Sequence, residues 1–174
     1  MLIKKTVIEC PTGAQNAVIA DFSAPFEYVN QQGERKITCI CTYQLAATYR
    51  NEMDVAVRKT VSEFITPSLH SKSKLRARIE GLLGKKMSEA EVPDTFDTAS
   101  LVGKPCLLNI IADESGYPRI QSLSRLPEGT PAMKPEGFVR PAWVDEQVNK
   151  SKASDPSAAA PQAKVDLNDV LKRI

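Results

Sequence analysis

Apolar and polar residues alternate over three stretches in the first part of the chain, which is the pattern of β-strands with one buried face. The first stretch is residues 14–30, and Pro25 is expected to break or bulge it near Ser23 because proline has no N–H to pair. The second is residues 34–48 and the third is residues 55–65. The face of the second strand that we expect in the core carries Ile37, Cys39, Cys41, Tyr43 and Leu45. Its other face carries Lys36, Thr38, Ile40, Thr42 and Gln44.

A basic, amphipathic helix is predicted over residues 71–86. Ser71 or Ser73 can cap its first turn, because a serine hydroxyl accepts a hydrogen bond from an unpaired N–H there. Gly84 is the expected C-terminal stop. The apolar residues recur at i, i+4, i+7 and i+8 and form one stripe, Leu75, Ile79, Leu82 and Leu83. Such a stripe must pack on a sheet or across the end of a barrel.

Two short strands are predicted after the helix, at residues 104–113 and 117–126. Strand–strand–strand–helix–strand–strand is the order of the OB barrel, a fold that often holds single-stranded nucleic acid. We therefore expect a mainly β protein with α, a five-stranded OB-like barrel whose helix lies between strands three and four.

The composition changes near residue 126. Residues 1–126 hold the periodic patterns and form the expected OB-like domain, whereas residues 127–164 are rich in proline, alanine and serine and indicate a flexible tail. Residues 165–174 form a short amphipathic segment with Leu167, Val170, Leu171 and Ile174 on one helical side, which we expect to bind a partner protein. Docking onto the chain's own domain is the alternative for this segment and for the island around Trp143.

Charge is informative only in its distribution, because the net charge is +2. Basic residues are concentrated between positions 58 and 86, against two acidic residues, Glu63 and Glu80. A solvated helix face explains this excess as readily as a nucleic-acid surface does.

Nucleic acid without sequence preference is held by basic residues along a groove and by aromatic faces on which bases stack. The basic candidates on the strands are Lys36, Arg50, Arg58 and Lys59. Those at the helix are Lys72, Lys74 and Arg78. Tyr28 and Tyr49 are the candidates for stacking, whereas Tyr43 has the parity of the core face.

No catalytic motif, cofactor site or metal site is expected. The single histidine, His70, is too little for a metal cluster or a hydrolytic triad, and no glycine-rich phosphate loop is present. The four cysteines lack the paired spacing of structural zinc sites and are expected to be buried and reduced. Because no long apolar run or export signal stands out, we expect no membrane span and a place in the cytoplasm.

Three motifs carry a resemblance to a known group of proteins. They are TPSLHSKSKLRARIEGLLGKK at 66–86, FDTASLVGKPCLLNI at 96–110, and the strand near Gln121 that runs into LPEG, ending at Gly129. In this half of the domain the chain resembles bacteriophage-encoded proteins associated with single-stranded DNA binding or replication. The resemblance implies an OB-like fold, a role in phage DNA metabolism and the cytoplasm of the host cell.

The first functional hypothesis is a non-enzymatic protein that binds single-stranded DNA in phage DNA replication or recombination. Its C-terminal segment would recruit a replication or recombination protein. The alternative is an interaction or assembly protein that uses an OB-like domain without nucleic acid, which the small net charge and the scarce aromatic residues favour. The sequence leaves open whether the ligand is DNA or RNA and whether the protein is a homo-oligomer.

Overall fold

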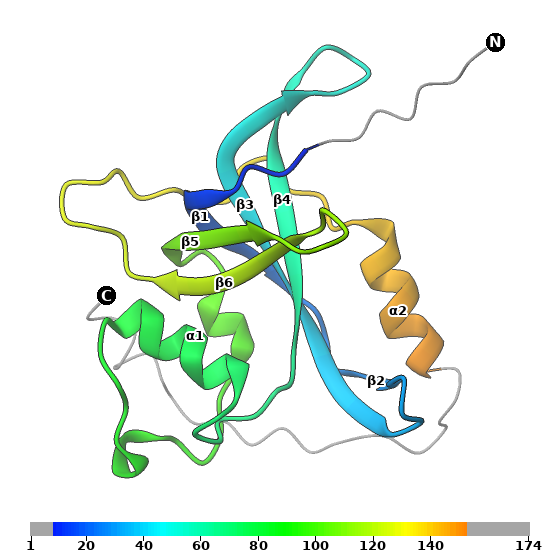
Figure 1. Cartoon of the computed structure of the whole chain (residues 1–174), viewed down its shortest axis with the longest axis vertical. Helices are drawn as coiled ribbons and strands as arrows, with labels where there is room; N and C mark the ends of the chain where they lie inside the picture. The colour runs from blue at the N-terminus through cyan, green and yellow to red at the C-terminus, as the bar shows by residue number, and fades with distance from the viewer. Residues whose placement is uncertain (1–8, 153–174) are drawn as a thin grey trace.

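The computed structural model describes residues 9–152, which form a mainly β protein with two α-helices (Figure 1). The strands are β1 (Gly13–Phe22), β2 (Phe26–Val29), β3 (Arg35–Arg50), β4 (Ala56–Ile65), β5 (Pro105–Ala112) and β6 (Pro118–Ser124). The α-helices are α1 (Lys74–Leu83) and α2 (Ala142–Lys152), and two short 3-10 helices are η1 (Glu89–Glu91) and η2 (Thr98–Leu101).

The first predicted strand is two strands, β1 and β2, which lie along the same edge of β3. The break falls at the expected place. Phe22 pairs with Cys41 and Phe26 with Thr38, so the first strand has one residue more than β3 over this interval. Ser23 fills the bulge, donating its N–H to the Ile40 carbonyl while its hydroxyl accepts from the Ile40 N–H.

The strands form one antiparallel, open sheet of six strands rather than the expected five-stranded barrel. β1 and β2 lie along one edge of β3 and β4 pairs with its other edge, while β5 and then β6 continue the sheet beyond β1. Within residues 9–152 no ladder joins β4 to β6, so the sheet is not closed by backbone hydrogen bonds. A side chain of α1 occupies the place where such a ladder would run.

That side chain is Arg78, which links the two unpaired edges. Its Nε and Nη2 donate to the two oxygens of Glu63 on β4, each at 2.9 Å, and Nη2 also donates to the Ile120 carbonyl on β6 at 3.0 Å. The Tyr43 hydroxyl donates to the same carboxylate at 2.8 Å. Burial raises the pKa of Tyr43 well above its ordinary value, so the phenol stays protonated and remains a donor. The group closes the core with side chains instead of a ladder.

Helix α1 is fitted to this end of the sheet by its sequence. Ser73 caps it by accepting from the Arg76 N–H, and Gly84 ends it in a left-handed conformation. Gly81 lies against β6 so closely that a Cβ there would be 2.1 Å from the Leu123 carbonyl oxygen. Leu75 and the rest of the predicted stripe therefore face the core. A larger residue at position 81 would push the helix off the sheet.

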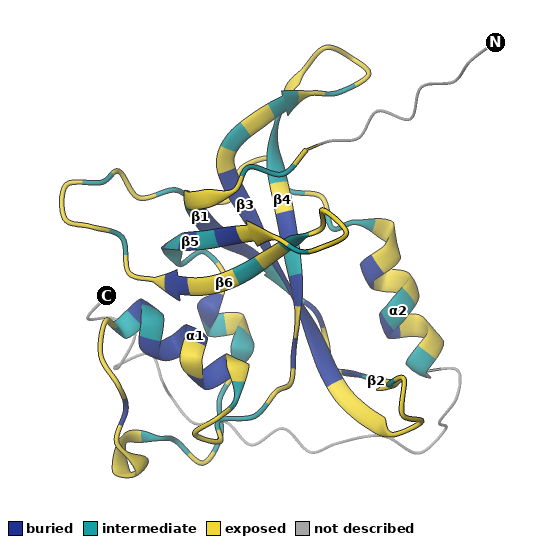
Figure 2. Ribbon diagram, viewed as in Figure 1, coloured by how far each residue is buried: buried dark blue, intermediate teal, exposed yellow. Residues whose placement is uncertain are grey.

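The core lies between α1 and the inner face of the sheet, as Figure 2 shows by the buried positions of β3 and α1. Of the predicted core face of β3, Cys39, Cys41, Tyr43 and Leu45 are buried. Ile37 is 57% exposed, because β3 extends past the end of the core there.

The opposite face of β3 is also buried, which the alternating pattern did not predict. Residues 134–152, here called the strap, run across this face and end in α2. Val144 and Val148 of α2 pack on Phe26 and Ile40 in a second apolar cluster. The expectation of a flexible tail from residue 127 therefore does not describe residues 134–152, whereas residues 153–174 lie outside the described part of the chain.

Polar contacts also fix the strap to the sheet. The side chain of Gln44 pairs with the backbone of Glu136, donating to its carbonyl at 2.7 Å and accepting from its N–H at 2.9 Å. Arg140 makes two hydrogen bonds to the carboxylate of Asp21, at 2.6 and 2.7 Å. The Glu27 N–H donates to the Ser151 hydroxyl near the end of α2. These contacts explain why polar positions of the outer face are buried.

Replacing Arg78 by methionine should lower the free energy of unfolding by about 3–5 kcal/mol, because the carboxylate of Glu63 would be left in a buried site without its main partner. Urea denaturation with an unchanged m-value measures this loss. Arg119→Met is the control, since Arg119 pairs with Asp113 at the surface and such pairs contribute at most about 1 kcal/mol. Equal losses in the two variants would contradict the role given to Arg78.

Replacing Val144 by aspartate should release α2 from the sheet, because an unpaired carboxylate would have to enter the apolar cluster. Trp143 is the only tryptophan, so its emission should shift to longer wavelength while the far-ultraviolet circular dichroism of the strands is retained. Val139→Asp is the matched control, since Val139 is 83% exposed on the same strap. An unchanged emission in Val144→Asp would show that α2 is not held by this contact.

Candidate functional site

The outer face of β4 is the part of the sheet that the strap leaves open. Strand alternation places Arg58, Thr60, Ser62 and Phe64 on this face, and they are here called the β4 row. The tip of the β5–β6 hairpin and the start of α2 both lie beside this row (Figure 1).

A groove of about 430 Å³ follows the row and is here called the β4 groove. Its floor includes Thr60, Ser62 and Phe64, and one wall carries Trp143 from α2. The other wall is the start of β6, and Lys74 also lines the groove. The full lining is Thr60, Val61, Ser62, Glu63, Phe64, Lys74, Tyr117, Pro118, Arg119, Ile120, Pro141 and Trp143.

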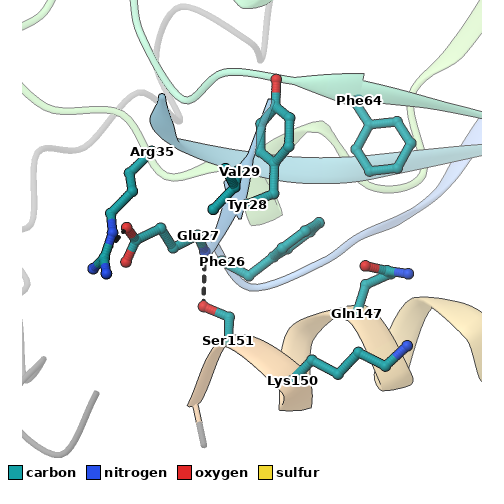
Figure 3. Close-up of a pocket in the computed structure, with 9 residues that line it drawn as sticks. All are labelled: Phe26, Glu27, Tyr28, Val29, Arg35, Phe64, Gln147, Lys150 and Ser151. Atoms are coloured by element: carbon teal, nitrogen blue, oxygen red, sulfur yellow. Dashed lines mark hydrogen bonds and ion pairs between the residues drawn. The ribbon is translucent and has the colours of Figure 1, made fainter. Parts of the chain in front are cut away.

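A second groove, of about 520 Å³, lies between β2 and α2 and is here called the β2 groove (Figure 3). Phe64 lines both grooves and therefore joins them. In Figure 3 the rings of Phe26, Tyr28 and Phe64 approach one another above α2, which contributes Gln147 and Lys150. Arg35 lies at the far side, 3.5 Å from the carboxylate of Glu27.

Aromatic rings cluster around Phe64. Its ring centroid is 6.3 Å from that of Phe26, 6.5 Å from that of Tyr28 and 6.4 Å from that of Trp143. Phe26 is buried, whereas Tyr28, Phe64 and Trp143 are 38%, 49% and 40% exposed. Three adjoining aromatic faces thus remain accessible on one surface, which is unusual for large apolar side chains unless they meet a ligand or a partner.

Both grooves carry more basic than acidic side chains. Lys74 and Arg119 line the β4 groove together with Glu63. The Glu63 carboxylate binds Arg78 and lies 3.5 Å from Lys74, and Arg119 pairs with Asp113. Arg35 and Lys150 line the β2 groove together with Glu27. The arrangement can hold a planar, apolar ring on the aromatic faces and a negative group at either side. It offers no nucleophile next to a general base within the two linings.

The structure separates the residues that the sequence proposed for nucleic-acid binding. Tyr28 and Lys74 line the two grooves, and Arg58 stands on the β4 row. Lys36 pairs with Tyr28 across β2 and β3, so it lies beside the β2 groove, in a salt bridge with Glu34.

Other proposed residues lie elsewhere. Lys59 and Tyr49 are on the opposite face of the β3–β4 ribbon from Arg58, because neighbouring residues of a strand alternate. Arg50 bonds to Asp54 in the loop at the tip of this ribbon. Lys72 is exposed before α1, away from both linings. The proposed residues therefore do not form one surface.

Arg78 is a correction. It is 6% exposed and bound to Glu63, so it does not reach a ligand at the surface. The other charges of the helix region are paired as well, Arg76 with Glu80 and Glu89, Lys85 with Glu91 and Lys86 with Glu80. The basic helix is therefore a structural element whose charge is largely neutralised within the fold.

Four groove residues are not among the site residues predicted from the sequence, namely Phe64, Trp143, Tyr117 and Arg119. Phe64 lies within the third predicted strand, residues 55–65. Phe64 is an even number of residues from Arg58 along β4, so the two side chains lie on the same face of the strand, and this alternation could have placed Phe64 on the outer face. Trp143 and the β5–β6 turn come from distant parts of the chain, and no local pattern brings them to β4.

The cysteines take no part in the grooves. Cys39, Cys41 and Cys106 are free and buried, and Cys10 is half-buried. Burial raises the pKa of Cys39 to about 11 and that of Cys106 to about 12, which disfavours the thiolate that metals and electrophiles require. Among residues 9–152, no three histidine, cysteine or acidic side chains gather in a way that could hold a metal ion.

The predicted partner-binding residues Leu167, Val170, Leu171 and Ile174 lie outside the described residues. No helix within residues 9–152 is long and apolar enough to cross a membrane. In comparisons with known proteins, no family model matches the chain and no curated protein matches it.

Proposed function

We propose that this protein binds single-stranded DNA, with its bases on the aromatic faces around Phe64 and its backbone beside the basic residues of the two grooves. The observation that carries the proposal is the cluster of Tyr28, Phe64 and Trp143, three accessible rings at the junction of the grooves. Single-stranded nucleic acid is held in this way because every base has a face that stacks, whatever its sequence.

We further infer that the sheet is an OB barrel that stays open between β4 and β6. The pairings β1–β3, β3–β4, β1–β5 and β5–β6 support this, with β2 as an addition to the link between the first two barrel strands. In this correspondence β3 and β4 are the second and third barrel strands, on whose face OB proteins bind oligonucleotides. The grooves flank this face.

A role in phage DNA replication or recombination, in the host cytoplasm, rests on the sequence resemblance alone. The recruitment of a replication protein by residues 165–174 is likewise a proposal from the sequence. The two grooves support a proposal about the kind of ligand and give no information about the biological process in which the protein acts.

A protein ligand is the second candidate. Exposed apolar residues favour it, Met53 and Val55 in the loop between β3 and β4, and Val29 and Ile37 on the β2–β3 hairpin. Met53 and Val55 lie outside both groove linings, so a protein bound to them would leave the site at Phe64 open, whereas Val29 lines the β2 groove and a protein bound there would compete with DNA.

Fluorescence anisotropy with a labelled oligo-dT strand tests the first proposal. The full chain should bind at low salt, and the affinity should fall linearly with salt on a logarithmic scale as phosphate contacts release counterions. Phe64→Ala should weaken binding about 5- to 150-fold, since stacking of one base contributes roughly 1–3 kcal/mol. Lys74→Ala should weaken binding and make the salt dependence less steep, because it removes one phosphate contact.

Tyr49→Ala is the control, since it removes an aromatic residue from the opposite face of the same ribbon. It should bind the strand as the unmodified protein does. No binding at low salt would overturn the proposal, and equal losses in Phe64→Ala and Tyr49→Ala would overturn the location of the site.

A further inference from the structure

The β4 row has a basic residue near each end, but only one of them lines a groove. Lys74 lines the β4 groove at the Phe64 end, where it donates to the Phe64 carbonyl. Arg58 stands at the other end, on the same face of the strand. From residue 58 to residue 64 a strand spans about 20 Å, at roughly 3.3 Å per residue. A nucleic-acid backbone that followed the row would meet both.

The strap closes the row at Arg58. The Arg58 Nη2 donates to the carboxylate of Glu136 at 2.7 Å, and its Nη1 donates to the Lys134 carbonyl at 2.8 Å. The side chain of Arg58 is 23% exposed, and that of Glu136 is 76% exposed. The guanidinium is thus mostly covered, whereas the carboxylate that it binds is largely open to solvent.

Glu136 is presented to Arg58 by a rigid backbone. The Gln44 side chain donates to the Glu136 carbonyl and accepts from the Glu136 N–H, so the main chain of Glu136 is held on both sides. The carboxylate itself has no part in these bonds. If another acceptor replaced the Glu136 carboxylate at Arg58, the strap would therefore stay in place, with Val144 and Val148 still packed on the sheet.

We propose that Glu136 is an internal competitor for phosphate at Arg58 and that it limits how far a single strand extends along β4. This rests on the function proposed above and assigns a regulator of the same site. A phosphate can displace the carboxylate, because an exposed ion pair is weak and a phosphate forms charge-assisted hydrogen bonds to a guanidinium of at least equal strength. The carboxylate thereby sets the affinity and its dependence on salt.

The test is oligo-dT binding by Glu136→Gln and Glu136→Ala, measured by anisotropy at several salt concentrations. Both variants should bind about 3- to 10-fold more tightly at low salt, because a phosphate then reaches Arg58 without competition from the carboxylate. The slope of log affinity against log salt should become steeper by about 0.7, which is one more phosphate contact on a single strand. The emission of Trp143 should not change, because the strap stays docked.

Two controls assign the effect to Arg58. Glu128→Gln removes the same charge from an exposed residue beyond β6 and should leave affinity unchanged. In an Arg58→Gln background, Glu136→Gln should have no further effect, because the group for which it competes is gone.

The outcomes separate the two proposals. If the unmodified protein binds and Glu136→Gln behaves like Glu128→Gln, the competitor role is wrong while the single-strand site stands. If Glu136→Gln tightens binding equally with and without Arg58, the effect is general charge and the inference is also wrong. If neither protein binds at low salt, the proposed function fails and the inference fails with it.

Discussion

The buried contact of Arg78 with Glu63 and Tyr43 is the constraint on which the rest of the structure depends. A sheet open between β4 and β6 would expose its core and two rows of backbone groups at those edges. Arg78 satisfies a carboxylate on one edge and a carbonyl on the other, and thereby ties α1 to both strands. Because alternate residues of β4 point to opposite sides, fixing Glu63 inward also fixes Ser62 and Phe64 outward. The open edge and the candidate site are thus two sides of one strand.

The strap determines which part of the outer face of the sheet stays accessible to a ligand. On a bare sheet the outer residues of β1, β3 and β4 would all be accessible, whereas here α2 and the segment before it cover much of β3 and leave the β4 groove and the β2 groove open. The same element that removes surface also adds to the site, because Trp143 forms a wall next to Phe64. A ligand that fits the β4 groove is narrow and has a face to stack, which describes a single strand better than a duplex. The functional proposal therefore depends on packing outside the sheet as much as on the sheet itself.

Local features of this fold were predictable from the sequence, and contacts between distant segments were not. The break near Ser23, the N-terminal cap of α1 and its C-terminal end each follow from one residue with a strong local preference, namely Pro25, Ser73 and Gly84. The burial of Gln44 was not predictable, because its partner Glu136 comes from a proline-rich stretch that looked like a tail. Arg78 was assigned to a ligand for the same reason, since alternation and helical periodicity say which residues share a face but not what covers that face. The residues of the candidate site could be predicted from the sequence only in part. Tyr28, Lys74 and Arg58 were proposed from charge and aromaticity, whereas Trp143 and Arg119 are brought to β4 by tertiary packing.

The path of the nucleic acid along β4 is the central claim, and nuclear magnetic resonance with ¹⁵N-labelled protein tests it most directly. On titration with a short oligo-dT strand, the largest shifts should fall on the backbone amides of Thr60, Ser62 and Phe64 and on the indole N–H of Trp143. The residues on the other face of the ribbon, such as Tyr49 and Lys59, should stay near their free positions. Largest shifts on that opposite face or at the ribbon tip around Met53, or no shifts at low salt, would contradict the account.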